Sequence, residues 1–570
     1  DMPNANTSEP FECWFDGISL TDAPSSSYVQ AEPIEVGIAG PAPLSADLAD
    51  VIGEDDTAVF LVELAANPFG NPPAPEDSPP PPITGPVGKL ALDLLDGWDR
   101  VVWTRTNDVV MPRTGKYAEK VSLRLPRGYY RLLATLWSGE PGQSRIISHD
   151  ERAAAVISFQ DPVPLGNRFG LNASAGCISG YTTALGAGWV WLDLPAQRIE
   201  TKAGLWDFAP WQADLKLARQ FNVEVVAGLT LPVIERFRRP FFEQWLAANP
   251  IQPIGVMVSP PAISTRPVGE YVEQLRWVSE LLAGASPPTR LVFDASALGN
   301  QAVPSAATQR PESANLVMGY ASTEGALPER SEPLLEEIGR RHTPPMRVWD
   351  LGVPVRLSGP ALPASPRPRV AASPRPHVPA SVLEPPPDPV LAASRMVRAI
   401  LIRALAGAQL VCCDATALAP PTSLYASDSV DAAARQALHE RDLTPRPALV
   451  AFERMTSLLN DATLVRWIDQ PGGARILLFE KDEGSAVAVA WRPFGLSPTY
   501  VSLAGLPSTV PILDCLGMPE PLLMEGNVRL LEVNEFVRYV VADAAQVRLL
   551  SEALDSARVR QVPPTSRPAS

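Results

Sequence analysis

Cysteine and histidine are scarce in this chain, and neither is arranged for metal binding. Five cysteines occur among 570 residues without a Cys-x-x-Cys spacing, and the four histidines include no pair four residues apart. Zinc sites use such spacings, so we expect no metal and no cofactor. The odd number of cysteines also excludes a fully closed disulfide framework. Cys412 and Cys413 directly follow an apolar pair, which is typical of buried structural thiols.

Long apolar runs and an excess of basic charge are also missing. No run reaches the roughly 18 apolar residues of a transmembrane helix. The formal net charge of -15 argues against nucleic acid or an anionic membrane as the main partner, because both attract basic surfaces. The chain opens at Asp1-Met2 without a basic and then apolar segment. The simplest interpretation is a mature chain that has lost a signal segment, although a trimmed chain has the same appearance. We therefore expect export to the periplasm, the cell surface or the medium.

The first part of the chain, residues 1–165, has the pattern of a β-sandwich. Short apolar or alternating runs separated by turn residues predict strands. They occur at 57–64, 100–106, 120–125, 129–137 and 153–159.

Strand and helix patterns alternate between residues 166 and 461, which predicts a parallel sheet. The expected strands are 168–174, 187–194, 223–231, 253–259, 290–296, 314–322, 345–353 and 408–416. The expected helices are 210–220, 241–248, 268–283, 329–341, 389–406 and 446–459. Eight such units match a (β/α)₈ TIM barrel, which typically has about 250 residues. An open doubly wound sheet is the alternative, but no glycine-rich phosphate-binding sequence follows the first strand.

β patterns return in the last part, residues 462–570, and predict a second β-sandwich. The expected strands are 474–480, 486–491, 500–503, 510–514, 528–533 and 536–541, followed by a short helix at 549–559. The predicted fold class is therefore α/β plus β, with a TIM barrel between N- and C-terminal β-sandwich domains.

Two segments are rich in proline. Residues 71–86 contain eight prolines, and the barrel insertion at 360–389 contains eleven. Proline favours extended polyproline II structure, so we expect extended loops that either dock protein partners or serve as plain surface loops.

Several segments resemble clan A glycoside hydrolases, with family 39 the most similar in pattern. They are Phe169-Gly-Leu-Asn172, Leu185-Gly-Ala-Gly-Trp-Val-Trp-Leu-Asp193, Gly204-Leu-Trp-Asp-Phe208 with Asp214, 222–232, and Leu443-Thr-Pro-Arg-Pro-Ala-Leu-Val-Ala-Phe452. The likeness covers about residues 170–570. It implies a catalytic barrel with carbohydrate as the substrate class.

The residues that the resemblance makes catalytic are replaced here. In clan A, a glutamate that ends the fourth strand is the acid/base, and the corresponding position falls at or beside Pro260. A second glutamate ends the seventh strand, where this chain has Asp350. Trp191 stands where these enzymes have an arginine in the second strand. Retaining hydrolysis needs two carboxyl groups roughly 5–5.5 Å apart. We therefore expect no catalytic residues of the family type.

Other side chains at the carboxyl ends of the strands are candidates for binding sugar. Sugars present apolar C–H faces that stack on aromatic rings, and tryptophan is also a normal packing residue. The acids at these ends either bind ligand or cap the following helices. The predicted carbohydrate-binding residues are Trp191, Asp193, Tyr320, Trp349 and Asp350.

Three functions remain open from the sequence. The first is a non-catalytic glycosidase-like protein that binds carbohydrate or serves as a scaffold subunit outside the cytoplasm. The second is an active glycosidase with displaced carboxylates, in which Asp350 is the nucleophile and Glu324 or Asp294 the acid. The third is a purely structural subunit without a ligand.

Overall fold

The computed structural model describes most of the chain, and several loops and both ends lie outside the description. The described residues are 34–41, 50–66, 85–159, 167–172, 180–249, 253–259, 268–284, 289–294, 316–321, 347–353, 388–405, 408–414, 438, 444–493 and 498–560. The segments that contain Cys13, Cys177, Glu324 and the expected helix 329–341 lie outside them. So do residues 67–84 and 354–387, which hold nearly all of the two proline-rich segments.

Two facing sheets form the N-terminal part. One sheet has the order β1 (Ile34–Ala39), β3 (Ala58–Ala66) and β6 (Lys116–Leu123). The other has the order β2 (Val51–Gly53), β8 (Ile146–Ile157), β7 (Gly128–Trp137), β4 (Gly85–Asp96) and β5 (Val101–Met111). Burial alternates along β7, as expected for a strand with one face toward a core. The apolar core between the sheets contains Phe60, Leu92 and Leu132.

The proline-rich loop ends earlier than predicted. Gly85 and Pro86 belong to β4 and pair with Met111 and Val110 of β5. Pro86 is tolerated because the ladder is irregular between Pro86 and Gly88, so a missing N–H donor costs little there. The sequence pattern did not predict β1, β2 or β4.

Eight parallel strands form a curled sheet that closes on itself. In spatial order they are β9 (Phe169–Asn172), β10 (Trp189–Pro195), β13 (Glu224–Thr230), β14 (Gly255–Ser259), β15 (Arg290–Asp294), β16 (Leu316–Ala321), β17 (Arg347–Val353) and β18 (Ala408–Asp414). Each overlaps a predicted strand. Because β18 pairs with β9, the alternative of an open sheet is wrong.

Helices follow most of these strands. They are α1 (Gly180–Ala184), α2 (Ala196–Ile199), α3 (Ala209–Gln220), α4 (Glu235–Ala248), α5 (Val268–Leu282), α8 (Pro389–Leu405) and α10 (Pro447–Leu459). A small hairpin, β11 (Glu200–Lys202) and β12 (Leu205–Trp206), precedes α3. The helix predicted at 241–248 begins earlier, at Glu235, and contains Pro240. Pro240 is the sixth residue of this helix, and its missing N–H removes one intrahelical hydrogen bond near the start of the helix.

Two further sheets and a helix form the C-terminal part. One sheet has the order β19 (Ala462–Asp469), β20 (Arg475–Lys481), β21 (Ala486–Trp491), β26 (Arg538–Ala542) and β23 (Ile512–Leu513). The other has the order β24 (Leu523–Glu525), β25 (Val528–Val533), β22 (Thr499–Leu503) and β27 (Arg558–Arg560). α11 (Val547–Asp555) ends earlier than the predicted helix, whose last residues belong to β27.

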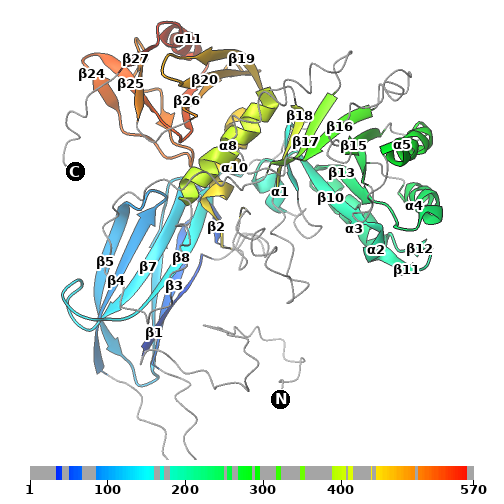
Figure 1. Ribbon diagram of the computed structural model, residues 1–570. Helices are drawn as coiled ribbons and strands as arrows, with labels where there is room; N and C mark the ends of the chain where they lie inside the picture. The colour runs from blue at the N-terminus through cyan, green and yellow to red at the C-terminus, as the bar shows by residue number, and fades with distance from the viewer. Residues whose placement is uncertain are drawn as a thin grey trace, which may run out of the picture.

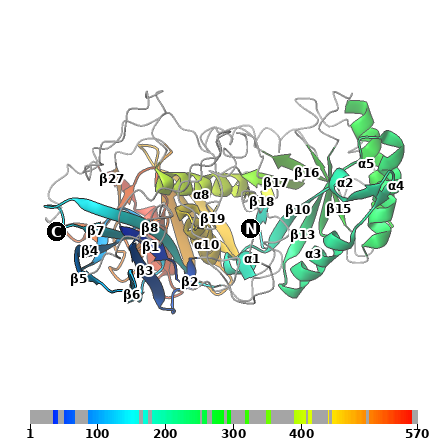
Figure 2. The same cartoon turned by 90° about the horizontal axis from the view of Figure 1, so that it is seen from below.

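α8 and α10 lie between the three parts (Figure 1). The view from below shows the same arrangement, with α8 running between the curled sheet and the β-rich parts (Figure 2). One continuous apolar cluster joins side chains of the barrel helices to residues of both flanking parts, among them Ile157 and Trp491. The three parts therefore share a core. Among the described helices, none combines the length and the apolarity that a membrane crossing requires.

Candidate functional site

The interior of the curled sheet is filled by apolar side chains. A separate cluster of buried residues contains Trp189, Trp191, Val226, Met257, Val292, Leu410 and Cys412. β10 and β18 each contribute two members that are two residues apart, as expected for one face of a strand. Trp189 and Trp191 both belong to this cluster and therefore point to the same face of β10.

Trp189 fills the space beside the first strand. A Cβ atom on Gly170 would lie 2.2 Å from the Trp189 ring, so only glycine fits there. The indole N–H of Trp189 donates to the carbonyl oxygen of Arg168 at 3.2 Å. Trp191 is 7% exposed, so most of its surface packs inside the barrel. Any contact of Trp191 with a ligand stays a prediction.

Acidic residues stand at the carboxyl ends of β15 and β18 and two residues before the end of β10. Asp193 of β10 is in register with Gly228, Asp294 of β15 with Gly319, and Asp414 of β18 with Asn172. For these acids the structure describes the backbone alone. Ligand sites in such sheets lie at the carboxyl ends of the strands, so the backbone places the three acids at the end expected for a site.

The other three predicted binding residues lie together on two adjacent strands. Tyr320 of β16 is in register with Asp350 of β17, and Trp349 with Gly319. Toward β18, Trp349 is in register with Leu410 and Asp350 with Val411. Leu410 belongs to the interior cluster, whereas Val411 belongs to the cluster that packs on the helices. The backbone thus brings Tyr320, Trp349 and Asp350 to one place, while β18 and β9 separate them from Trp191 and Asp193 on β10.

The order of the strands identifies the fourth and the seventh strand, where the resemblance places the two glutamates. Counted from β9, β14 is the fourth strand and β17 the seventh. β14 ends at Ser259, so Pro260 follows it directly in the sequence. Asp350 lies within β17, and the ladder to β18 is irregular on both sides of the Trp349–Asp350 pair.

A polar network outside the barrel interior escaped the sequence analysis. Ser394 of α8 donates to the carbonyl oxygen of Glu535 at 3.0 Å and accepts from the Val537 N–H at 2.8 Å. Arg395 forms an ion pair with the Glu535 carboxylate at 2.9 Å, and both side chains are almost fully buried. Arg398 is fully buried and donates to the carbonyl oxygen of Pro493 at 2.9 Å. The signal for this network in the sequence was a pair of arginines three residues apart within a strongly apolar helix.

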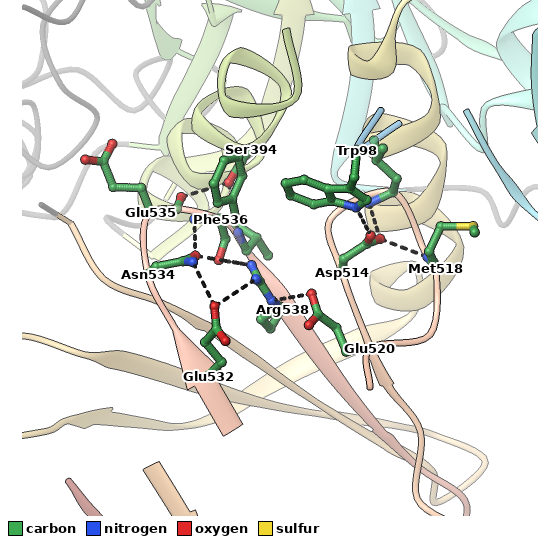
Figure 3. A network of polar contacts seen from close by, with 12 residues as sticks. Trp98, Ser394, Asp514, Met518, Glu520, Glu532, Asn534, Glu535, Phe536 and Arg538 are labelled. Carbon is green, nitrogen blue, oxygen red and sulfur yellow. Dashed lines mark hydrogen bonds and ion pairs between the residues drawn. The ribbon is translucent and has the colours of Figure 1, made fainter. Parts of the chain in front are cut away.

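The same region holds Arg538 and joins the C-terminal part to the other two (Figure 3). Arg538 forms an ion pair with Glu520 at 2.8 Å. Nearby, the indole N–H of Trp98 donates to Asp514 at 2.5 Å, linking the N- and C-terminal parts. Burial raises the pKa of Asp514 to about 6, although the bonds from Trp98 and from the Met518 N–H act to lower it.

A buried glutamate lies on α10 beside the N-terminal part. Burial raises the pKa of Glu453 to about 7, while the neighbouring charges of Arg127 and Arg454 act to lower it. Asp214, which the family resemblance singled out, lies within α3, and burial raises its pKa to about 6. Both acids are on helices and not at the strand ends. Within the described ranges, no group of three or more His, Cys, Asp or Glu side chains is arranged to hold a metal ion.

Comparisons with known proteins address the fold. No protein-family model and no curated protein matches the sequence. A family 39 glycoside hydrolase from Bacteroides cellulosilyticus WH2 is similar in structure, with a TM-score of 0.59 and 13% identity, over 81% of this chain and 98% of that one. A family 30 subfamily 8 xylanase, Xyn30A from Clostridium acetobutylicum, has a TM-score of 0.44 and 11% identity, over 66% of this chain and 96% of that one. This chain therefore has a glycoside hydrolase-like fold, in which a curled parallel sheet is combined with flanking β-sheets.

Proposed function

We propose that this protein binds carbohydrate at the carboxyl end of its parallel sheet without hydrolysing it. The supporting observation is the make-up of two strands. β14 ends on Ser259 and is followed by Pro260, at the place where the resembling enzymes have their acid/base glutamate. β17 has one acid, Asp350, at the place where the resembling enzymes have their second glutamate. Retaining hydrolysis needs paired carboxyl groups about 5–5.5 Å apart, and neither strand supplies its glutamate.

The proposal includes a complete architecture. Residues 166–461 form a (β/α)₈ TIM barrel with its insertion at 360–389, between β-sandwich domains at 1–165 and 462–570. The closed order of eight strands supports it, and so do the helices that follow β10, β13, β14, β17 and β18. In this fold the loops after the strands form the ligand site.

Aromatic and acidic residues at this end suit a sugar. Tyr320, Trp349 and Asp350 occupy adjacent register positions on β16 and β17. An aromatic ring offers a flat apolar surface for the C–H face of a pyranose, and a carboxylate accepts hydrogen bonds from its hydroxyl groups. Asp193 lies two residues after Trp191 on β10, and we propose it as the sugar contact on that side of the curled sheet.

Binding and turnover separate this proposal from its rival. Titration calorimetry with a panel of soluble oligosaccharides should detect binding in the full chain, and Trp349→Ala should weaken it at least tenfold. Trp103→Ala on β5, far along the chain from the barrel, is the matched control and should leave binding unchanged. Reducing-sugar assays on the same panel should give no product. Absence of binding to every oligosaccharide would refute the proposal.

An active glycosidase with displaced carboxylates is the second candidate, and the acids at or near the carboxyl ends of β10, β15 and β18 favour it. Asp350 as nucleophile and Asp294 as acid come from strands separated only by β16. As a nucleophile, Asp350 would need the acid about 5–5.5 Å away; at about 6.5–9.5 Å it would instead be the general base of inverting hydrolysis, so adjacent strands are not required. Release of reducing sugar that disappears in both Asp350→Asn and Asp294→Asn would establish this candidate.

Export and a scaffold role complete the proposal. An exported protein should be recovered from the periplasm, the cell surface or the medium when cells expressing the gene are fractionated. A scaffold subunit should elute with partners when the native protein is purified under mild conditions. Recovery in the cytoplasmic fraction would contradict export without affecting sugar binding.

A further inference from the structure

Strand β19 presents an exposed tryptophan at the edge of the C-terminal sheet. Among the described strands β19 pairs with β20 alone, and every second residue along it is exposed. Val465 is 47% exposed and Trp467 is 38% exposed, so both rank among the exposed large apolar side chains of the described residues. Exposed tryptophan is unusual because the ring has a large apolar surface, and it often marks a contact site.

Two polar partners fix the orientation of this ring. The indole N–H of Trp467 donates to the Asp469 carboxylate at 3.0 Å. The guanidinium carbon of Arg475 lies 5.4 Å from the centroid of the Trp467 ring. Arg475 Nε also lies 3.7 Å from the Asp469 carboxylate, so the three side chains contact one another. A ring held in this way loses little conformational entropy when a ligand binds.

The backbone beside the three residues is equally well fixed. Asp469 and Arg475 are direct cross-strand partners at the start of the β19–β20 turn. Two glycines, Gly472 and Gly473, adopt positive φ in this turn, which favours glycine. The N–H of Gln470 also donates to the carbonyl oxygen of Ala474 at 2.8 Å. The site therefore lies at the end of a short, hydrogen-bonded hairpin.

The chemistry of these three residues selects a neutral, hydroxyl-rich ligand. Asp469 and Arg475 cancel in charge, so neither an anion nor a cation is favoured electrostatically. Carboxylate oxygens accept hydrogen bonds from hydroxyl groups, and guanidinium N–H groups donate to them. The exposed surface of two apolar side chains is also far smaller than the roughly 800 Å² that each partner buries in a standard protein interface. A flat apolar ring beside one acceptor and one donor matches a sugar ring.

We propose that Trp467, Asp469 and Arg475 form a surface binding site for a polysaccharide chain, separate from the end of the barrel. This inference shares with the proposed function only its ligand class, carbohydrate, because it uses no residue of the barrel. The surface site holds one or two sugar residues of a long chain. It keeps the protein on the polymer while the barrel contacts a different stretch.

Affinity electrophoresis of the full chain tests the surface site. Native gels contain soluble arabinoxylan, xyloglucan, galactomannan or a mixed-linkage β-glucan, and retardation measures binding. At least one polymer should retard the wild type, and Trp467→Ala should weaken that binding about tenfold or more. Asp469→Asn and Arg475→Gln should weaken it less. Val465→Ala on the same strand is the matched control and should stay within about twofold of the wild type. Thermal unfolding of each variant confirms that it is folded.

The outcomes separate this inference from the proposed function. Trp349→Ala should lose binding of short oligosaccharides but keep the retardation that depends on Trp467. Equal retardation of the wild type and Trp467→Ala, or no retardation in any of the four polymers, would overturn the surface site and leave the barrel proposal to its own titration. A wild-type dimer that dissociates in Trp467→Ala would also overturn it, because the tryptophan would then be a protein contact.

Discussion

Replacement of Glu453 by glutamine should change how stability depends on pH. Glu453 is fully buried on α10, and burial raises the pKa of its carboxyl group from 4.5 to about 7. Arg127 and Arg454 favour the charged form, but burial, with Glu54 acting in the same direction, outweighs them. The folded chain therefore binds a proton here over a pH range in which the unfolded chain has lost it.

The sign and the size of the effect follow from this difference. Below pH 4.5 the carboxyl group is protonated in both states, and it costs no stability. As the pH rises from 4.5 to about 7, the unfolded state releases its proton first, so the folded state is progressively destabilised. The difference between a pKa of 4.5 and one of about 7, at about 1.36 kcal/mol per pH unit, gives a penalty of about 3 kcal/mol above pH 7. Glutamine carries no charge and should avoid this penalty.

Urea denaturation of both chains between pH 4.5 and pH 8 measures the difference. Glu453→Gln should match the wild type near pH 4.5, and its advantage should grow to about 3 kcal/mol at pH 8. Glu552→Gln on the exposed face of α11 is the control and should run parallel to the wild type. If the difference between Glu453→Gln and the wild type does not change with pH, or if the variant loses stability as the pH rises, the reasoning is wrong.

Three substitutions test the packing and the contacts between the parts. Gly170→Ala should destabilise the chain by about 1–3 kcal/mol or more in urea denaturation, because the new Cβ would lie 2.2 Å from the ring of Trp189; an unchanged midpoint would contradict the close contact. Glu535→Ala should cost about 3–5 kcal/mol, since it leaves buried arginines of α8 without their carboxylate; protease cleavage between the barrel and the C-terminal part should speed up measurably. Trp98→Phe should cost about 1–3 kcal/mol through the lost hydrogen bond to Asp514, and a neutral result would indicate that water replaces the indole N–H.

Much of the fold could be predicted because buried strands leave a strong pattern. All eight strands of the curled sheet were predicted, since each is a short apolar run between turn residues. Strands with one exposed face were harder: β19 alternates as Ala-Thr-Leu-Val-Arg-Trp-Ile-Asp, and it was missed because arginine and threonine interrupt the pattern. β27 has two arginines in three residues, and its pairing with β22 depends on tertiary structure.

The candidate site was less predictable than the fold. Sequence places Tyr320, Trp349 and Asp350 near the ends of neighbouring strands, and the backbone confirms that they are neighbours. The strand register decides which of these residues are on the interior face of the sheet. A shift of one residue moves every side chain to the opposite face. The irregular ladder between β17 and β18 sets that register. A bulge of this kind leaves no signal in the order of the residues.

The long separation between α8 and its partners matters while the protein is being synthesised. Arg398 lies 137 residues before Glu535, whose backbone it contacts. At roughly 5–20 residues per second, the ribosome needs on the order of 10 seconds to make that stretch. During this interval the nascent barrel can close its strands, but the arginines of α8 still lack their partners. Packing of the C-terminal strands against α8 is therefore a late step of folding. In a chain stalled before residue 535, the arginines of α8 remain unpaired and accessible to chaperones and proteases.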